Sequence, residues 1–304
     1  MIRPKSLFPG ARVALLCASS PVPPERLEPA IESVRVMGFE PVVYPSCTLR
    51  HGYLAGDDAQ RAADVMHAFA DDSIDGILCI RGGYGAARIL KLLDFNAIAC
   101  RPKYFGGYSD VTALHTAFNR LCGFITYHTP MPSTELYTEL DAYTMYHLEQ
   151  CLFGGHFGQL ENPVGVPLEP VQGGSCVGTL TGGNLSLIAS AVGTPWEPDF
   201  EGKVLFLEDV EEKPRKVDAM LTQLINAGKL QSCAGIALGA FTDCIAENPE
   251  ESLTLEEIFE ELLAPLGIPV LKGLQCGHIM PTLSLPLGEQ VLLDTDKRTV
   301  TVLD

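Results

Sequence analysis

The sequence predicts an α/β protein: an N-terminal parallel-sheet domain with flanking helices, followed by a smaller, β-rich C-terminal domain. In the first half, short apolar runs alternate with segments of helical periodicity, which is typical of a parallel sheet covered by helices. A stretch rich in Gly and Pro interrupts this alternation, and the order of elements beyond it is mixed. A chain of 304 residues also exceeds the usual size of one hydrophobic core. We therefore expect a domain over 1–152, a linker over 153–173 and a domain over 174–304.

The elements of the first domain follow from local periodicity. Residues 77–80 are wholly apolar, as buried parallel strands tend to be. Ala62, Val65, Met66 and Phe69 recur at the spacing of one helix face. The predicted strands are 12–17, 40–44, 75–80 and 104–107. The predicted helices are 25–37, 58–70, 86–93 and 111–121.

The second domain gives one clear helix. The predicted helix is 215–227, in which Val217, Leu221 and Leu224 share one face, and Gly228 follows as a stop signal. The remaining predicted elements are helices 185–192 and 255–263, strands 203–207 and 234–238, and two strands within 289–303.

Composition excludes several classes of function. Hydrophobic residues make up 46% of the chain and charged residues 19%, which is a globular composition. The net charge of −17 comes without a Lys/Arg cluster, which argues against nucleic acid as a partner. No apolar run approaches the roughly 20 residues that span a bilayer, and the run 13–18 is too short for a signal sequence. Ten cysteines without C-x-x-C spacing fit a reducing compartment, so we expect a cytoplasmic protein without a metal site.

The segment IRGGYGAAR (80–88) follows a predicted strand and opens a helix. A dinucleotide loop is excluded, because Arg88 stands at the third position of the G-x-G-x-x-G pattern that Gly83 and Gly85 begin. Two interpretations stay open at this point. The loop either stabilises an oxyanion through exposed N–H groups or is a plain strand-to-helix turn.

The segment FGGYSDVTALH (105–115) forms a second strand-to-helix turn. Ser109 lies where the apolar run ends, as in a nucleophile elbow, and the N–H of Asp110 follows it. Ser and Asp are equally the preferred helix N-caps. Only the first glycine of G-x-S-x-G is present, since Val111 replaces the second. The residues alone do not separate a nucleophile from a cap.

Carboxylates end the apolar strand VLFLEDVEEKP (204–214), where an α/β protein commonly places its site. One of them could orient a histidine. The pattern does not choose among Glu208, Asp209, Glu211 and Glu212.

Seven histidines are available as a general base. We favour His128 in YHTPM and His278 in QCGHIMPT, because both lie in predicted loops. His115 lies one turn into the helix after Ser109.

Six segments, in this order, resemble the LD-carboxypeptidase family of serine peptidases, which includes murein tetrapeptide carboxypeptidases and microcin C resistance peptidases. They are AGDDAQRAADVMHAFAD (55–71), RGGYGAARIL (81–90), GYSDVTALH (107–115), GTLTGGNLSLIASAVGTPW (178–196), LFLEDVEEKP (205–214) and GLQCGH (273–278). The resemblance covers nearly the whole chain. Thr129 departs from it, since the family often has glycine in the corresponding His-Gly-Pro-Met.

The resemblance implies a serine-type carboxypeptidase. Its nucleophile corresponds to Ser109, its acid to Glu208 and its base to His278. The oxyanion hole would use the backbone N–H groups of Gly83 and Asp110. This chemistry needs neither a metal nor an organic cofactor.

The family's substrate is a small peptide with an L-configured centre before a D-amino acid, as in muropeptides with a terminal D-Ala in cytoplasmic murein recycling. Arg81 could bind the terminal carboxylate or form a structural ion pair. The alternatives are a peptidase that cleaves a toxic peptidyl-nucleotide and a non-catalytic α/β binding protein. Homodimers are common among such enzymes, although no feature of this sequence shows one.

Overall fold

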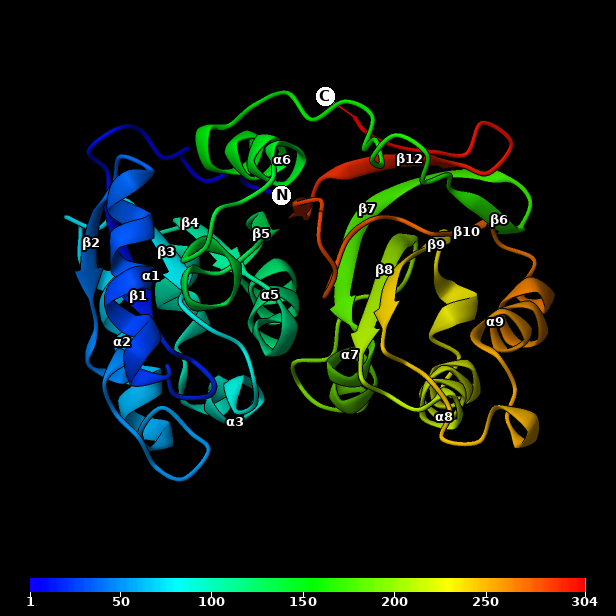
Figure 1. Ribbon diagram of the computed structural model, residues 1–304, viewed down its shortest axis with the longest axis horizontal. Coiled ribbons are helices and arrows are strands. Elements are labelled where there is room, and N and C mark those ends of the chain that lie inside the picture. The colour runs from blue at the N-terminus through cyan, green and yellow to red at the C-terminus, as the bar shows by residue number, and fades with distance from the viewer. Residues whose placement is uncertain (304) are drawn as a thin grey trace. The chain divides into compact units, whose positions relative to one another are not determined.

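The computed structural model describes residues 1–303, which form two compact units (Figure 1). Unit 1 contains Met1–His156 together with Ser284–Leu287. Unit 2 contains Phe157–Leu283 and the chain from Gly288 onward. The chain therefore enters unit 2, returns to unit 1 for one short strand, and enters unit 2 again.

Among the described residues, unit 1 is built on a six-stranded sheet with the order β11-β5-β4-β3-β1-β2. All neighbouring strands are parallel except β11, which pairs with β5 in the antiparallel direction. The strands are β1 (Arg12–Leu16), β2 (Glu40–Val43), β3 (Gly76–Cys79), β4 (Tyr104–Gly107), β5 (Thr126–His128) and β11 (Leu285–Leu287). Because β1, β3 and β4 are parallel, the loops that follow them leave from the same edge of the sheet.

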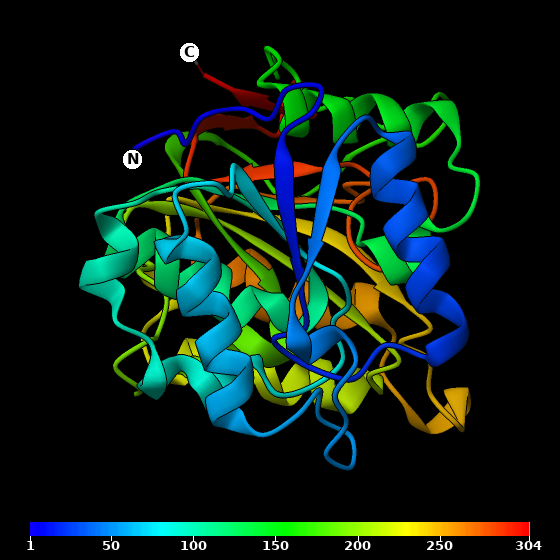
Figure 2. The same cartoon turned by 90° about the vertical axis from the view of Figure 1, so that its left-hand side faces the viewer.

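Helices lie on both faces of this sheet. Figure 2 looks toward β1 and β2, with α1 on one side of them and α2 on the other. Helix α2 begins at a capping box, in which Asp57 and Gln60 satisfy each other's backbone N–H groups. The helices of unit 1 are α1 (Pro24–Val36), α2 (Asp58–Ala70), α3 (Ala86–Ile89), α4 (Phe95–Ala99), α5 (Thr112–Ala117) and α6 (Ala142–Phe153).

Unit 2 contains, in the part of the chain that the structure describes, a mixed seven-stranded sheet with the order β13-β12-β7-β8-β9-β10-β6. The four central strands β7, β8, β9 and β10 are parallel, and the outer strands are antiparallel to their neighbours. The strands are β6 (Glu169–Gln172), β7 (Ser175–Asn184), β8 (Lys203–Val210), β9 (Gly235–Thr242), β10 (Val270–Lys272), β12 (Gln290–Asp294) and β13 (Thr299–Val302).

Three helices pack on one face of this second sheet (Figure 1). They are α7 (Leu185–Ala191), α8 (Pro214–Asn226) and α9 (Leu255–Leu263). Leu205 and Leu207 of β8 belong to the same buried cluster as these helices. Since side chains alternate along a strand, Glu208 projects from the opposite face.

The α/β fold class with a β-rich second unit is confirmed, whereas several boundaries differ. The predicted helix 86–93 is the short α3 followed by a 3₁₀ turn, and 111–121 is α5 followed by a π-helical turn. Strand β7 was not predicted, because its glycines weaken β-propensity. A Cβ at Gly182 would stand 2.0 Å from the Phe206 carbonyl oxygen, so this close backbone approach requires glycine. No helix among residues 1–303 is long and apolar enough to cross a membrane.

Leu221→Ala is expected to destabilise unit 2 by about 2–5 kcal/mol, because Leu221 is fully buried between α8 and the sheet. Lys216→Ala on the exposed side of the same helix is the matched control and should change stability by less than about 0.5 kcal/mol. Urea denaturation of both variants measures the difference. Equal losses of stability in the two variants would show that burial of Leu221 does not stabilise unit 2.

Candidate active site

Glu208 and His278 form a hydrogen-bonded pair within unit 2. His278 Nδ1 lies 2.7 Å from Glu208 Oε2, and the His278 backbone N–H donates to the same oxygen over 3.3 Å. The Glu208 side chain is completely buried, whereas 17% of the His278 side chain is exposed. The structure thus brings together two residues that are 70 positions apart in the chain.

Glycines allow the loop that carries His278 to approach Glu208. Gly277 has a φ of 118°, and a Cβ there would stand 2.6 Å from Glu208 Oε2. A Cβ at Gly239 of β9 would stand 2.5 Å from the Cys276 carbonyl, which accepts a hydrogen bond from Ala240 N over 2.9 Å. The pairing of β8 with β9 shifts register between Leu207 and Asp209, beside Glu208. Such irregularities commonly re-aim a side chain next to a functional site.

The geometry of this pair fixes the chemistry of the imidazole. A carboxylate accepts hydrogen bonds only, so Nδ1 of His278 carries the proton that lies between them. Nε2 is then the nitrogen that can accept a proton. A buried carboxylate also stabilises the imidazolium that forms when Nε2 is protonated.

The neighbouring acids have other roles. Asp209 accepts hydrogen bonds from Asn184 Nδ2 over 2.8 Å and from Ser186 N over 3.0 Å, which holds the start of α7. Glu211 is exposed and has a φ of 58°. Glu212 is half-buried in the turn before α8. The structure therefore places only Glu208 against a histidine among these four acids.

Ser109 stands on a sharp turn at the end of β4 in unit 1. Its φ of 64° is uncommon for a residue other than glycine and stores strain that a plain helix cap does not need. The helical segment that starts here has no side-chain cap. A Cβ at Gly82 would stand 2.9 Å from Ser109 Cβ, so the glycine loop packs directly on the serine. The structure therefore places Ser109 on a strained strand-to-helix turn, against the glycine loop.

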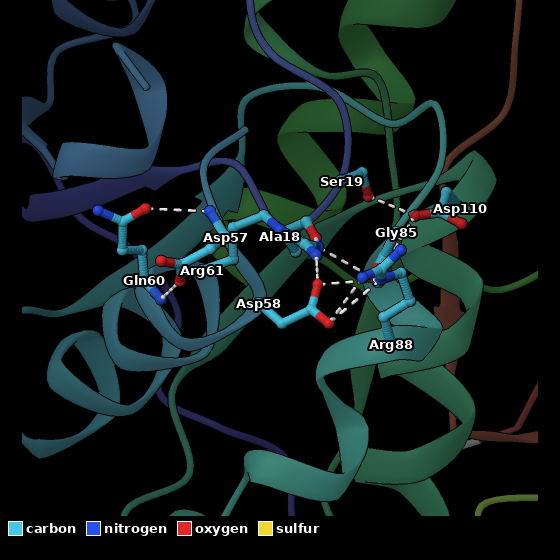
Figure 3. Close-up of polar contacts among 10 residues, drawn as sticks. Ala18, Ser19, Asp57, Asp58, Gln60, Arg61, Gly85, Arg88 and Asp110 are labelled. Carbon is cyan, nitrogen blue, oxygen red and sulfur yellow. Dashed lines mark hydrogen bonds and ion pairs between the residues drawn. The ribbon is translucent and has the colours of Figure 1, made fainter. Parts of the chain in front are cut away.

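Asp110 turns its carboxylate away from its own helix. Oδ2 accepts a hydrogen bond from Ser19 Oγ over 2.5 Å (Figure 3) and another from Ala86 N over 2.7 Å. Burial raises the pKa of the Asp110 carboxyl, and the bonds from Ser19 and Ala86 act in the opposite direction. Asp110 therefore joins the turns that follow β1, β3 and β4.

The glycine loop after β3 is held at several points. Gly83 has a φ of 110°, and a Cβ there would stand 2.3 Å from Ser20 Oγ. Ser20 Oγ accepts a hydrogen bond from Tyr84 N over 3.1 Å, and Ser20 N donates to Gly82 O over 3.3 Å. Arg81 is half-buried and donates to the Pro21 carbonyl over 2.8 Å.

A buried guanidinium lies beneath the same turns. Arg61 is fully buried and donates to the carbonyls of Ala18 and Gly85 and to the carboxylate of Asp58 (Figure 3). Asp58 also accepts from Arg88 Nε over 3.0 Å. Burial lowers the pKa of Arg61, and Asp58 opposes that effect. The sequence prediction missed Arg61, although a charged residue beside Ala62 and Val65 on the apolar face of α2 was the available signal.

Two other histidines, His115 and His128, are buried in unit 1. His115 is fully buried, and its Nε2 lies 2.8 Å from the Gly107 carbonyl at the end of β4. Burial lowers the pKa of His115 to about 4, so the ring is neutral and donates this bond near pH 7. His128 ends strand β5 rather than lying in a loop, and its ring packs 5.4 Å from that of Tyr108.

Residues 13–129 match the LD-carboxypeptidase N-terminal domain, and residues 177–293 match the LD-carboxypeptidase C-terminal domain. A "probable murein peptide carboxypeptidase" of Bacillus subtilis is 37% identical over 301 residues, which cover 99% of this chain and 94% of that protein.

Two further proteins extend the comparison. The murein tetrapeptide carboxypeptidase of Pseudomonas aeruginosa is 31% identical over 293 residues, or 94% of each chain. The crystal structure of muramoyltetrapeptide carboxypeptidase from Oxalobacter formigenes superposes with a TM-score of 0.83 at 28% identity, covering 96% of this chain and 98% of that one.

His115 is expected to make stability depend on pH. Its pKa of about 4 in the folded chain lies below the ordinary value of 6.5, so its contribution is complete above pH 6.5 and is lost as the pH falls toward 4. The loss amounts to roughly 3 kcal/mol. His115→Gln keeps an amide donor for the Gly107 carbonyl but does not titrate in this range.

Urea denaturation of both proteins at several values between pH 7 and pH 4 measures this contribution. The free energy of unfolding should decrease more steeply in the unaltered protein than in His115→Gln. Parallel profiles would contradict the assignment of a neutral, buried His115.

Proposed function

Because this chain belongs to the LD-carboxypeptidase family of serine-type hydrolases, we propose that it releases the terminal D-Ala of a muropeptide tetrapeptide by hydrolysing an L,D peptide bond. The observation that carries the proposal is the buried Glu208 carboxylate hydrogen-bonded to His278 Nδ1 over 2.7 Å. A carboxylate–imidazole pair of this kind prepares the second imidazole nitrogen to act as a general base. The relatives with murein-peptide names support the substrate class.

Ser109 is the proposed nucleophile. The strained φ of 64° is what an elbow uses to present Oγ above the end of a strand. Oγ attacks the scissile carbonyl while His278 Nε2 takes its proton. The imidazolium then returns the proton to the leaving amine of D-Ala, and water hydrolyses the acyl-enzyme by the same route in reverse.

His278 and Ser109 belong to different units of the chain. Ser284, the first residue of the strand that returns to unit 1, follows His278 by six residues. Six residues span at most roughly 20 Å when fully extended. The proposed mechanism therefore requires that His278, which precedes this strand, reaches Ser109 in the active protein.

The oxyanion hole is proposed to use the N–H groups of Gly83 and Asp110. Both residues lie on the turns beside Ser109, and the packing of Gly82 on Ser109 supports the assignment. Removal of one such donor typically raises the barrier by about 3 kcal/mol. Arg81 is our proposed ligand for the terminal carboxylate, since its bond to Pro21 uses only one of five guanidinium N–H groups.

A role in cytoplasmic murein recycling fits this chemistry. The ten cysteines are free thiols in the structure, and several are fully buried, which suits a reducing compartment. A peptide product that has lost D-Ala is the expected output of such an enzyme.

Ser109→Ala and His278→Ala are each expected to abolish measurable hydrolysis of a muropeptide tetrapeptide that ends in D-Ala. Glu208→Gln should reduce kcat by roughly 10⁴-fold, since it removes the charge that stabilises the imidazolium. Released alanine measures turnover, and circular dichroism checks the fold. Full activity of Ser109→Ala would remove the proposed mechanism and favour a non-catalytic or differently catalysed role.

Three matched substrates test the specificity. The same tetrapeptide ending in L-Ala tests the stereochemistry, and the D-Ala amide tests recognition of the free carboxylate. A peptidyl-nucleotide tests the alternative substrate class. Hydrolysis confined to the peptidyl-nucleotide would overturn the murein assignment while leaving the serine mechanism intact.

Gly82→Ala is expected to reduce kcat at least tenfold, because the added methyl meets Ser109 Cβ at 2.9 Å and Oγ at 3.2 Å. Gly173→Ala is the matched control, since a Cβ there has nothing within 4 Å and neither position has a left-handed φ. Steady-state kinetics of the two variants measure the effect. Unchanged turnover in Gly82→Ala would show that the position of Ser109 tolerates displacement.

A further inference from the structure

We propose that the side-chain carboxylate of Asp110 is a positioning residue that holds the two turns carrying the oxyanion donors in a fixed relation. The inference rests on the proposed function and extends it to a residue whose side chain touches no reacting atom. In this assignment Asp110 has two separate roles: its backbone N–H faces the developing oxyanion, and its carboxylate fixes the turn that carries the other donor.

The first observation is that one carboxylate oxygen of Asp110 accepts hydrogen bonds from two different loops. Asp110 Oδ2 accepts from Ser19 Oγ, in the loop after β1, and from Ala86 N, at the end of the glycine loop after β3. Asp110 itself belongs to the turn after β4. A single oxygen therefore connects the loops of three adjacent parallel strands at one edge of the sheet (Figure 3).

The second observation is that the buried guanidinium of Arg61 binds the same two segments as the Asp110 carboxylate. Arg61 donates to the carbonyls of Ala18 and Gly85, and Asp110 accepts from the next residue of each pair, Ser19 and Ala86. The cation thus satisfies the carbonyls and the anion satisfies the donors on the same two segments. Such a network has few alternative arrangements, because moving either segment would leave a buried charge without its partner.

The third observation is that the Asp110 carboxylate is buried, which is unfavourable for a charged group. Only 2% of Asp110 is exposed, and the helical segment that contains it has no side-chain cap. A serine or threonine would satisfy a local backbone donor without a buried charge. The buried carboxylate is therefore accounted for by the distant segments that it joins rather than by its own helix.

The network would affect catalysis through the positions of the two oxyanion donors, the backbone N–H groups of Gly83 and Asp110. The Asp110 N–H is fixed by the elbow, whereas the Gly83 N–H belongs to a loop tied down by Ser20 on one side and by the bond from Ala86 to Asp110 on the other. Oxyanion stabilisation depends on donor positions within a few tenths of an ångström. Loss of the carboxylate should misplace these donors for the transition state without removing groups that bind the ground state.

Ser19→Ala is the principal test variant, because it removes one bond to the carboxylate and leaves the buried charge in place. Asp110→Asn is the second variant. Asp141→Asn is the matched control, since Asp141 likewise accepts a backbone N–H and a hydroxyl, both from Thr144, at the start of α6. We expect kcat to fall about 10- to 100-fold in the first two variants, with KM within about twofold of its original value. The control should retain its kcat.

Two binding measurements distinguish a role in positioning the oxyanion donors from a general loss of structure. A peptide boronic acid, whose boron replaces the scissile carbonyl carbon, forms a tetrahedral adduct with Ser109, so its inhibition constant should rise by the same factor as kcat falls. Binding of the intact tetrapeptide, measured in a Ser109→Ala background with and without Ser19→Ala, should not change.

Retention of both kcat and boronate affinity in Ser19→Ala and Asp110→Asn would overturn the inference. Equal losses in tetrapeptide binding and in boronate binding would overturn it too, since they would indicate a structural role alone. If Asp110→Asn fails to fold, Ser19→Ala still decides the question. Failure of the proposed function is recognised separately, because the unaltered protein would then lack L,D activity or retain it without Ser109.

Discussion

A carboxylate can stay charged in a protein interior only if hydrogen-bond donors replace the water that it loses. Both units of this protein are shaped by that constraint. In unit 1, Asp110 draws the loops after β1 and β3 toward the turn after β4. In unit 2, Glu208 draws the loop of His278 onto the end of β8. Gly277 permits the short approach to Glu208, since a Cβ there would stand 2.6 Å from Oε2.

Much of the first unit could be predicted from the sequence, because local periodicity determines a parallel sheet with helices on both faces. The second sheet was harder to predict. Strand β7 contains Gly178 and Gly182, which propensity assigns to loops, whereas the structure uses both where β7 lies close to β8. Strand β11 was missed because three residues carry no periodic signal and its partner β5 lies far away in the sequence.

The candidate site was predictable in its residue types and not in its connections. Spacing could not distinguish Glu208 from Asp209, since the choice depends on which face of β8 the helices cover, and that is a tertiary property. Spacing could not reveal the positive φ of Ser109 or the lack of a side-chain cap at this turn, because both depend on the local backbone conformation. Arg61 and Ser19 escaped prediction altogether, because their importance arises from partners 24 to 91 residues away along the chain.

The return of residues 284–287 to the first sheet affects how the protein can be divided. A fragment that begins at residue 157 would carry β11 without β5, and a fragment that ends at residue 156 would leave β5 as a bare edge. Exposed strand edges promote association between chains. The family models cover the chain as an N-terminal and a C-terminal domain, yet separate expression of the two halves would divide a sheet rather than a linker.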